Sequence, residues 1–161
     1  MTPENPTNYG MRGHRVPPLT ADFIQQVTSR VRDVLGMKKR SFQGKNPEKL
    51  LLKLEHYGIN IDVVEDDEWI DATKAMVDPQ KGMIYIPNKL YDEICRGRAD
   101  AVRIFLHELG HVVLGHKPLL HFSTDKPTEN EDSEWQADYF ADSMIALLDL
   151  PKAEAQLEFK F

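Results

Sequence analysis

The chain has a single cysteine, Cys95, so it cannot form an internal disulfide and carries no sign of an oxidising compartment. It also lacks long apolar runs. No stretch approaches the roughly 18 apolar residues of a membrane span, and residues 1–15 have no apolar core of the kind found in signal peptides. These absences exclude a disulfide-stapled secreted domain, and we expect a cytoplasmic protein without membrane contact.

The composition is that of an ordinary globular protein, with 41% hydrophobic and 29% charged residues among 161. The net charge of −6 is unevenly distributed. Residues 1–53 carry 10 Lys and Arg against 4 Asp and Glu, whereas residues 54–161 carry 10 against 22. The basic N-terminal third either forms a solvated face or contacts nucleic acid or a partner protein, although no nucleic-acid-binding motif accompanies it.

Three stretches differ in their patterning. Residues 1–19 are rich in Pro, Asn and Gly without an apolar period, which predicts an N-terminal arm that is flexible or draped over the surface. We expect one domain over residues 20–150 and a C-terminal tail over residues 151–161. Nothing repeats at a fixed period.

The first half of this domain combines helical and strand signals. Apolar residues recur at helical spacing over residues 23–35, and Asn46 and Pro47 mark the start of a second helix. Residues 59–63 alternate like a half-buried strand, and residues 69–86 resemble a hairpin. We predict an α+β fold with N-terminal helices and a small, three-stranded, largely antiparallel sheet, in which residues 83–86 form an exposed edge.

Further helices follow the sheet. A short one is predicted over residues 88–95. Residues 101–114 are apolar on nearly every side, which predicts a central, buried helix, and Gly110 within it predicts close approach by a neighbouring segment. A last amphipathic helix runs from Trp135 to Leu148.

The buried helix contains the pentapeptide His107-Glu108-Leu109-Gly110-His111. Residues four apart lie about 40° from each other around a helix, so both imidazoles project from one face and can bind one metal ion. Glu108 lies about 100° from His107, which suits a general base rather than a ligand. Neutral imidazole suits Zn²⁺, and a catalytic zinc site takes three protein ligands.

Glu134 is the best candidate for the third ligand, because Asp138 follows it four residues later on the same predicted helix. Asp138 would then accept a hydrogen bond from the outward ring nitrogen of a ligating histidine and so orient it. Glu129, Glu131 and His121 remain lesser candidates. His116 would face away on a continuing helix, about 180° from His107.

These residues resemble the ImmA/IrrE family of zinc metallopeptidases. The similarity rests on His107–His111 with the apolar residues 112–114 behind it, and on Glu134-Trp-Gln-Ala-Asp138-Tyr-Phe-Ala141. The resemblance implies a zincin-like domain with two metal-bearing helices, a zinc ion and a protein substrate, typically a helix-turn-helix repressor of a phage, mobile-element, defence or stress-response system. It also implies His107, His111 and Glu134 as ligands and Glu108 as general base.

The sequence leaves open which residue would stabilise a reaction intermediate, whether Cys95 has a regulatory role, and whether the protein is an enzyme. Tyr85, Tyr139 or His121 would stabilise a tetrahedral intermediate, and the Cys95 thiolate would regulate the site if it reached the metal. A zinc-containing module that holds a repressor or toxin without cleaving it is the alternative to an enzyme. Glu108 favours the enzyme, because metal binding alone does not require it.

Overall fold

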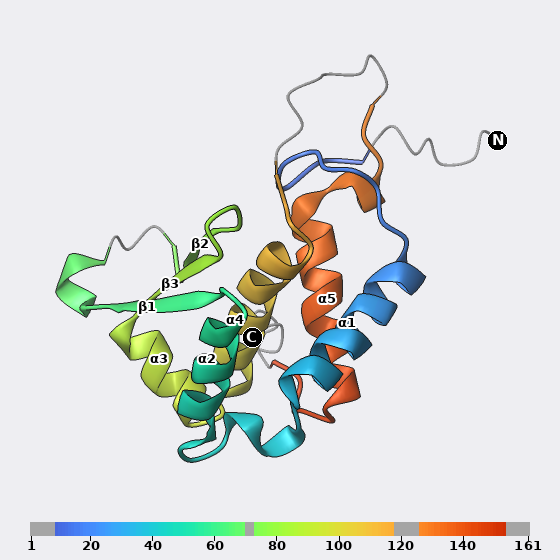
Figure 1. Ribbon diagram of the computed structural model, residues 1–161. Helices are drawn as coiled ribbons and strands as arrows, with labels where there is room; N and C mark the ends of the chain where they lie inside the picture. The colour runs from blue at the N-terminus through green and yellow to red at the C-terminus, as the bar shows by residue number, and fades with distance from the viewer. Residues whose placement is uncertain (1–8, 70–72, 118–125, 154–161) are drawn as a thin grey trace, which may run out of the picture.

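The computed structural model describes residues 9–69, 73–117 and 126–153. The helices are α1 (Ala21–Leu35), α2 (Asn46–His56), α3 (Asn88–Cys95), α4 (Ala99–Val113) and α5 (Ser133–Leu147), and the strands are β1 (Asn60–Val64), β2 (Met76–Asp78) and β3 (Met83–Pro87) (Figure 1). Short 3-10 turns over Lys39–Phe42, Asp66–Glu68 and Glu129–Glu131 complete the described elements. The predicted α+β class is confirmed. None of the described helices is long and apolar enough to cross a membrane.

Local signals set the ends of the first two helices. Thr20 caps α1 by accepting a hydrogen bond from the backbone N–H of Phe23, and Gly36 ends it in a left-handed conformation with φ 60°. Helix α2 begins one residue earlier than predicted. The Asn46 side chain donates to the backbone oxygen of Arg40 at 2.8 Å instead of capping the helix.

The sheet is mixed rather than largely antiparallel, which corrects the prediction from the strand patterns. Its order is β1-β3-β2, with β1 parallel and β2 antiparallel to β3. Strand β3 therefore lies in the centre, and residues 83–86 are not an exposed edge. Alternating burial marks a segment as a strand but does not specify its neighbours, so the crossover could not be inferred from the sequence.

Helix α4 is central, as its apolar character predicts. It lies between the sheet and α5, and α5 packs against α1 on its other side (Figure 1). At the α4–α5 contact Gly110 has no side chain, and a Cβ atom there would lie 3.1 Å from Phe140 and 3.3 Å from the Ala137 backbone. The close approach predicted at Gly110 is thus the contact between the two helices that carry the site.

The N-terminal segment, residues 9–19, runs past the start of α5 (Figure 1). Arg15 forms an isolated antiparallel bridge with Asp132, and the Val16 N–H donates to the Glu131 oxygen at 2.8 Å. The Val16 side chain is buried. The predicted boundaries of arm, domain and tail stay predictions, but residues 9–19 clearly contact the helix that carries Glu134 and Asp138.

Candidate metal centre

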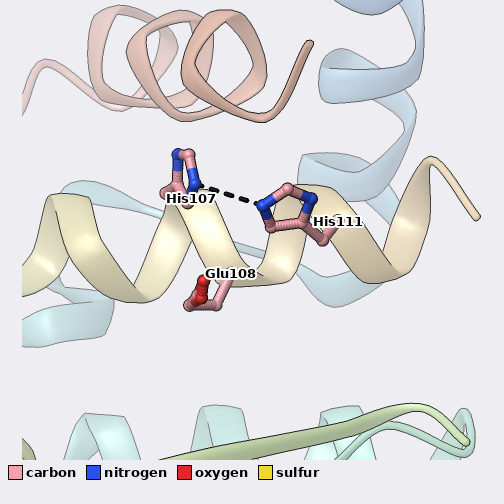
Figure 2. A group of neighbouring side chains, drawn as sticks. All are labelled: His107, Glu108 and His111. Carbon is pink, nitrogen blue, oxygen red and sulfur yellow. Dashed lines mark hydrogen bonds between the residues drawn. The ribbon is translucent and has the colours of Figure 1, made fainter. Parts of the chain in front are cut away.

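His107 and His111 lie one turn apart on α4 and face α5 (Figure 2). Their Nε2 atoms are 3.2 Å apart, and the rings meet edge to face. The arrangement follows from the i, i+4 spacing on a regular helix. Both histidines thus direct the same ring nitrogen to one point.

Helix α5 brings the Glu134 carboxylate to that same point. Its Oε1 lies 3.1 Å from His107 Nε2, and its Oε2 lies 2.8 Å from His111 Nε2. Asp132 caps the helix by accepting from the Glu134 N–H at 2.9 Å, so Glu134 lies in the first turn. The two hydrogen bonds to the histidines hold the pKa of Glu134 well below its usual range.

Asp138 lies one turn further along α5, next to the outward nitrogen of His107. Its Oδ1 is 2.8 Å from His107 Nδ1, the position expected of an orienting carboxylate. Burial lowers the pKa of His107, but the hydrogen bonds to Asp138 and Glu134 outweigh burial and raise it to about 9. Arg12 and Arg103 also contact the Asp138 carboxylate, at 2.9 and 3.4 Å.

Glu108 projects from another side of α4, toward the sheet, while the two histidines face α5 (Figure 2). It is buried, and among the described residues its Oε2 has no hydrogen-bond partner. Burial raises the pKa of Glu108, protonated His107 and His111 lower it, and Glu134 raises it, with a net increase. One carboxylate oxygen of Glu108 lies within 4.8 Å of a nitrogen of each histidine. A buried carboxylate oxygen without a partner is costly unless it serves a function.

His116 contacts the site, contrary to the prediction that it faces away. Helix α4 ends at Val113, and Gly115 at φ 63° turns the chain so that His116 returns to His111. The two Nδ1 atoms are 2.8 Å apart, and His116 Nε2 lies 2.7 Å from Gln136 Oε1. Burial lowers the pKa of His116 to about 4. The prediction failed because it continued the helix through Gly115.

The other candidate residues lie elsewhere. Glu131 pairs with Arg15 at 2.9 Å, and the Tyr139 hydroxyl accepts from Gln25 at 2.8 Å. Cys95 ends α3, where burial raises the pKa of its thiol. His121 lies outside the described residues. A ligand role for Glu129, an oxyanion role for Tyr85 and a regulatory role for Cys95 find no supporting contact among the residues described.

A cavity of about 360 Å³ opens beside Glu108, and we call it the cleft. Its lining includes Ala75 with Met76 and Val77 of β2, Glu108 and His111 of α4, and His14 of the N-terminal segment. His14 is held there by its backbone, because its N–H donates to Ser133 Oγ and its oxygen accepts from the Ser133 N–H, both at 3.0 Å. No motif or spacing in the sequence singles out His14.

Residues 99–158 match the family described as the IrrE N-terminal-like domain, a peptidase family. This part of the chain is similar to the ImmA/IrrE family. The matched range contains α4 and α5, and hence His107, Glu108, His111, Glu134 and Asp138. No curated protein and no solved structure matches the chain. The ImmA/IrrE assignment supports a metallopeptidase domain, and such a domain acts on a protein substrate.

The side chains of the candidate metal centre fit a zinc ion by their own geometry. Zinc bonds of about 2.0–2.1 Å in a tetrahedral site place two ligand atoms about 3.3 Å apart. The three atom pairs among His107, His111 and Glu134 are separated by 3.2, 3.1 and 2.8 Å. Two imidazoles and one carboxylate are also a donor set that zinc accepts.

Proposed function

We propose that this protein is a zinc-dependent endopeptidase. The observation that carries the proposal is the Glu134 carboxylate, which contacts both His107 Nε2 and His111 Nε2 while Glu108 lies buried nearby with a free oxygen. His107, His111 and Glu134 would hold the metal. Asp138 would orient His107 through Nδ1.

Glu108 and Glu134 are both acidic neighbours of the histidines, and their contacts favour different roles. Glu134 approaches both histidine nitrogens and has a lowered pKa, as a ligand requires. Glu108 has one oxygen without a partner in the described part of the chain, has a raised pKa and borders the cleft. This environment suits a group that takes up a proton and then gives it away.

The proposed reaction is hydrolysis of a peptide bond. When bound, zinc supplies Lewis acidity and makes water a nucleophile near neutral pH. Glu108 accepts a proton from the attacking water and later donates it to the leaving amine, so the carboxylate is regenerated at the end of the cycle. Its raised pKa brings both steps closer to neutral pH.

An extended peptide would bind along β2. This strand pairs only with β3 among the described strands, and it borders the cleft that contains Glu108. Pairing through main-chain hydrogen bonds would place the peptide beside the metal centre with little demand on its sequence. This assignment replaces residues 83–86, the edge expected from the sequence, with Met76–Asp78.

The proposed substrate is a specific protein, in the first instance a helix-turn-helix repressor. The ImmA/IrrE family assignment supports this choice, since members of the family are typically associated with such repressors. A DNA-binding substrate places the proposed reaction in the cytoplasm. The basic N-terminal third is a further proposed contact, although Arg12 and Arg15 have acidic partners within the chain.

Incubation with a candidate helix-turn-helix repressor, taken from the source genome, tests the proposal. We expect the zinc-loaded protein to cleave it and the Glu108→Gln variant to bind the same amount of zinc without cleaving. Binding of the repressor by both forms without cleavage would support the alternative, a holding module. In parallel, Glu134→Gln should lower zinc content, whereas Glu129→Gln, on the short turn before α5, should not. Equal zinc content in both variants contradicts the ligand assignment.

A further inference from the structure

Three buried side chains, those of His111, His116 and Gln136, form a series of hydrogen bonds that leads away from the metal centre. His111 Nδ1 lies 2.8 Å from His116 Nδ1, and His116 Nε2 lies 2.7 Å from Gln136 Oε1. His111 and His116 are each 7% exposed and Gln136 is 1% exposed. These side chains are almost wholly buried, although His111 and His116 also border the cleft, so most of their hydrogen bonds are made within the protein.

The orientation of the Gln136 amide is fixed by its other contacts. Its Nε2 donates to the Pro17 oxygen at 3.0 Å and to the Asn130 oxygen at 2.8 Å. Both hydrogens of the amide are thereby used, and Oε1 faces His116. A carbonyl oxygen only accepts, so His116 Nε2 must carry a hydrogen.

The contact between the two Nδ1 atoms then matches the tautomer that metal binding requires. A neutral histidine that binds a metal through Nε2 carries its hydrogen on Nδ1. With one hydrogen, on Nε2, His116 keeps a lone pair on Nδ1, which lies 2.8 Å from His111 Nδ1. In the metal-bound site the His111 Nδ1–H would therefore donate to His116 Nδ1.

We propose that His116 and Gln136 are positioning residues that hold His111 in the tautomer required for metal binding through Nε2. This inference rests on the proposed metal centre and extends it. His107 is oriented by the charged Asp138, whereas His111 is oriented by a neutral relay. The relay is anchored outside the matched domain, because Gln136 donates to Pro17 of the N-terminal segment.

Histidine nitrogen NMR tests the assignment directly. Long-range ¹H–¹⁵N correlation spectra of the metal-free and zinc-loaded protein distinguish protonated from bare ring nitrogens. We expect His116 to carry its hydrogen on Nε2 in both forms. In the zinc-loaded protein we expect His111 to carry its hydrogen on Nδ1 and to bind zinc through Nε2. Zinc coordination through His111 Nδ1, or a hydrogen on His116 Nδ1 instead of Nε2, overturns the proposal.

Zinc affinity gives a second readout that does not depend on peptidase activity. Loss of such an orienting partner typically costs roughly tenfold to a hundredfold in metal affinity. We expect that loss for His116→Ala and for Gln136→Met in competition with a chelator. His116→Gln should recover part of it, because its amide oxygen can accept from His111 Nδ1–H. His56→Ala, at the exposed end of α2, is the matched control and should change nothing.

The outcomes separate this proposal from the proposed function. Unchanged zinc affinity in a folded His116→Ala variant overturns the relay, with folding checked by the thermal unfolding of the metal-free protein. If a variant fails to fold, the NMR experiment on the unaltered chain still decides. Failure of the unaltered chain to bind zinc refutes the metallopeptidase proposal, while the hydrogen position on His116 remains measurable in the metal-free protein.

Discussion

Arg12 and Asp138 form a salt bridge between the N-terminal segment and the metal centre. Arg12 Nη1 lies 2.9 Å from Asp138 Oδ2, and the other oxygen of the same carboxylate lies 2.8 Å from His107 Nδ1. Residues separated by more than 120 positions are thus coupled through one carboxylate. Since Pro17 also contacts the Gln136 side chain, the N-terminal segment supports the partners of both histidines.

The first prediction concerns this salt bridge. Arg12 is half exposed and Arg103 also contacts Asp138, so Arg12→Ala should weaken zinc binding by only about twofold to fivefold. Asp138→Asn should weaken it by roughly tenfold to a hundredfold, because it alters the orientation of His107 itself. Chelator competition measures both. Arg32→Ala, which breaks an exposed pair with Asp33, is the control. If Arg32→Ala weakens zinc binding as much as Arg12→Ala does, the Arg12–Asp138 salt bridge has no specific effect on the metal centre.

The second prediction concerns the close approach of the N-terminal segment to α5. A Cβ atom at Gly13 would lie 2.5 Å from Ser133 Oγ and 2.7 Å from Glu134 Cγ. Gly13→Ala should therefore lower the free energy of unfolding by about 1–3 kcal/mol and weaken zinc binding through Glu134. Gly10→Ala is the matched control, because nothing lies within 4 Å of its Cβ position. Equal denaturation midpoints for the two variants would falsify the prediction.

The residues of the candidate site could be predicted from the sequence where they recur at helical spacing. The i, i+4 spacings of His107 with His111 and of Glu134 with Asp138 each place two groups on one helix face, and the structure brings the two faces together. Gly110 also indicated the helix contact that makes this possible. Local periodicity thus determined most of the candidate metal centre.

The rest depends on contacts between segments far apart in the chain. Arg12 and Pro17 lie in a segment without any apolar period, so nothing local marks their positions against α5. His116 was excluded because the helix was continued through Gly115, which in fact turns the chain. The partners of β3 were also not encoded locally, since its pattern fits either an edge or a central strand.

The third prediction concerns Asp132, which joins the N-terminal segment to α5. Its fully buried carboxylate accepts hydrogen bonds from the Tyr9 hydroxyl and from the backbone N–H groups of Arg12, Gly13 and Glu134, at 2.6 to 3.0 Å. Asp132→Asn replaces one acceptor oxygen with an NH₂ group that faces donors. We expect a loss of about 1–3 kcal/mol in the free energy of unfolding. Asp62→Asn, on an exposed position of β1, should cost little.

The same residue gives a prediction for pH. Burial raises the pKa of Asp132, but the hydrogen bonds from the N-terminal segment and Glu134 outweigh it and lower the pKa below 3.8. Because the folded-state pKa is the lower one, this stabilisation is fully present above about pH 4 and is lost as the pH falls through the folded-state pKa. Urea unfolding should show a difference between the unaltered chain and Asp132→Asn that is constant near neutrality and shrinks below pH 4. A difference that grows with acidity would contradict the assignment.

The last prediction concerns Gly110, where two effects oppose each other. Alanine favours a helix interior by about 1 kcal/mol over glycine. At this position, however, the Cβ atom would lie 3.3 Å from the Cα and oxygen of Ala137, which are backbone atoms of α5 and cannot move without the helix. Overpacking of this kind costs about 1–3 kcal/mol, so we expect Gly110→Ala to lower the free energy of unfolding by up to about 2 kcal/mol.

The larger effect of Gly110→Ala should be on zinc binding. His107 and His111 belong to α4 and Glu134 to α5, so any separation of the helices lengthens the contacts between the donor atoms. Zinc affinity should therefore fall in Gly110→Ala even at temperatures where the variant is fully folded. A variant that is stabilised by about 1 kcal/mol and binds zinc as before would mean that helix propensity outweighs the contact, and that the spacing of α4 and α5 does not control the metal centre.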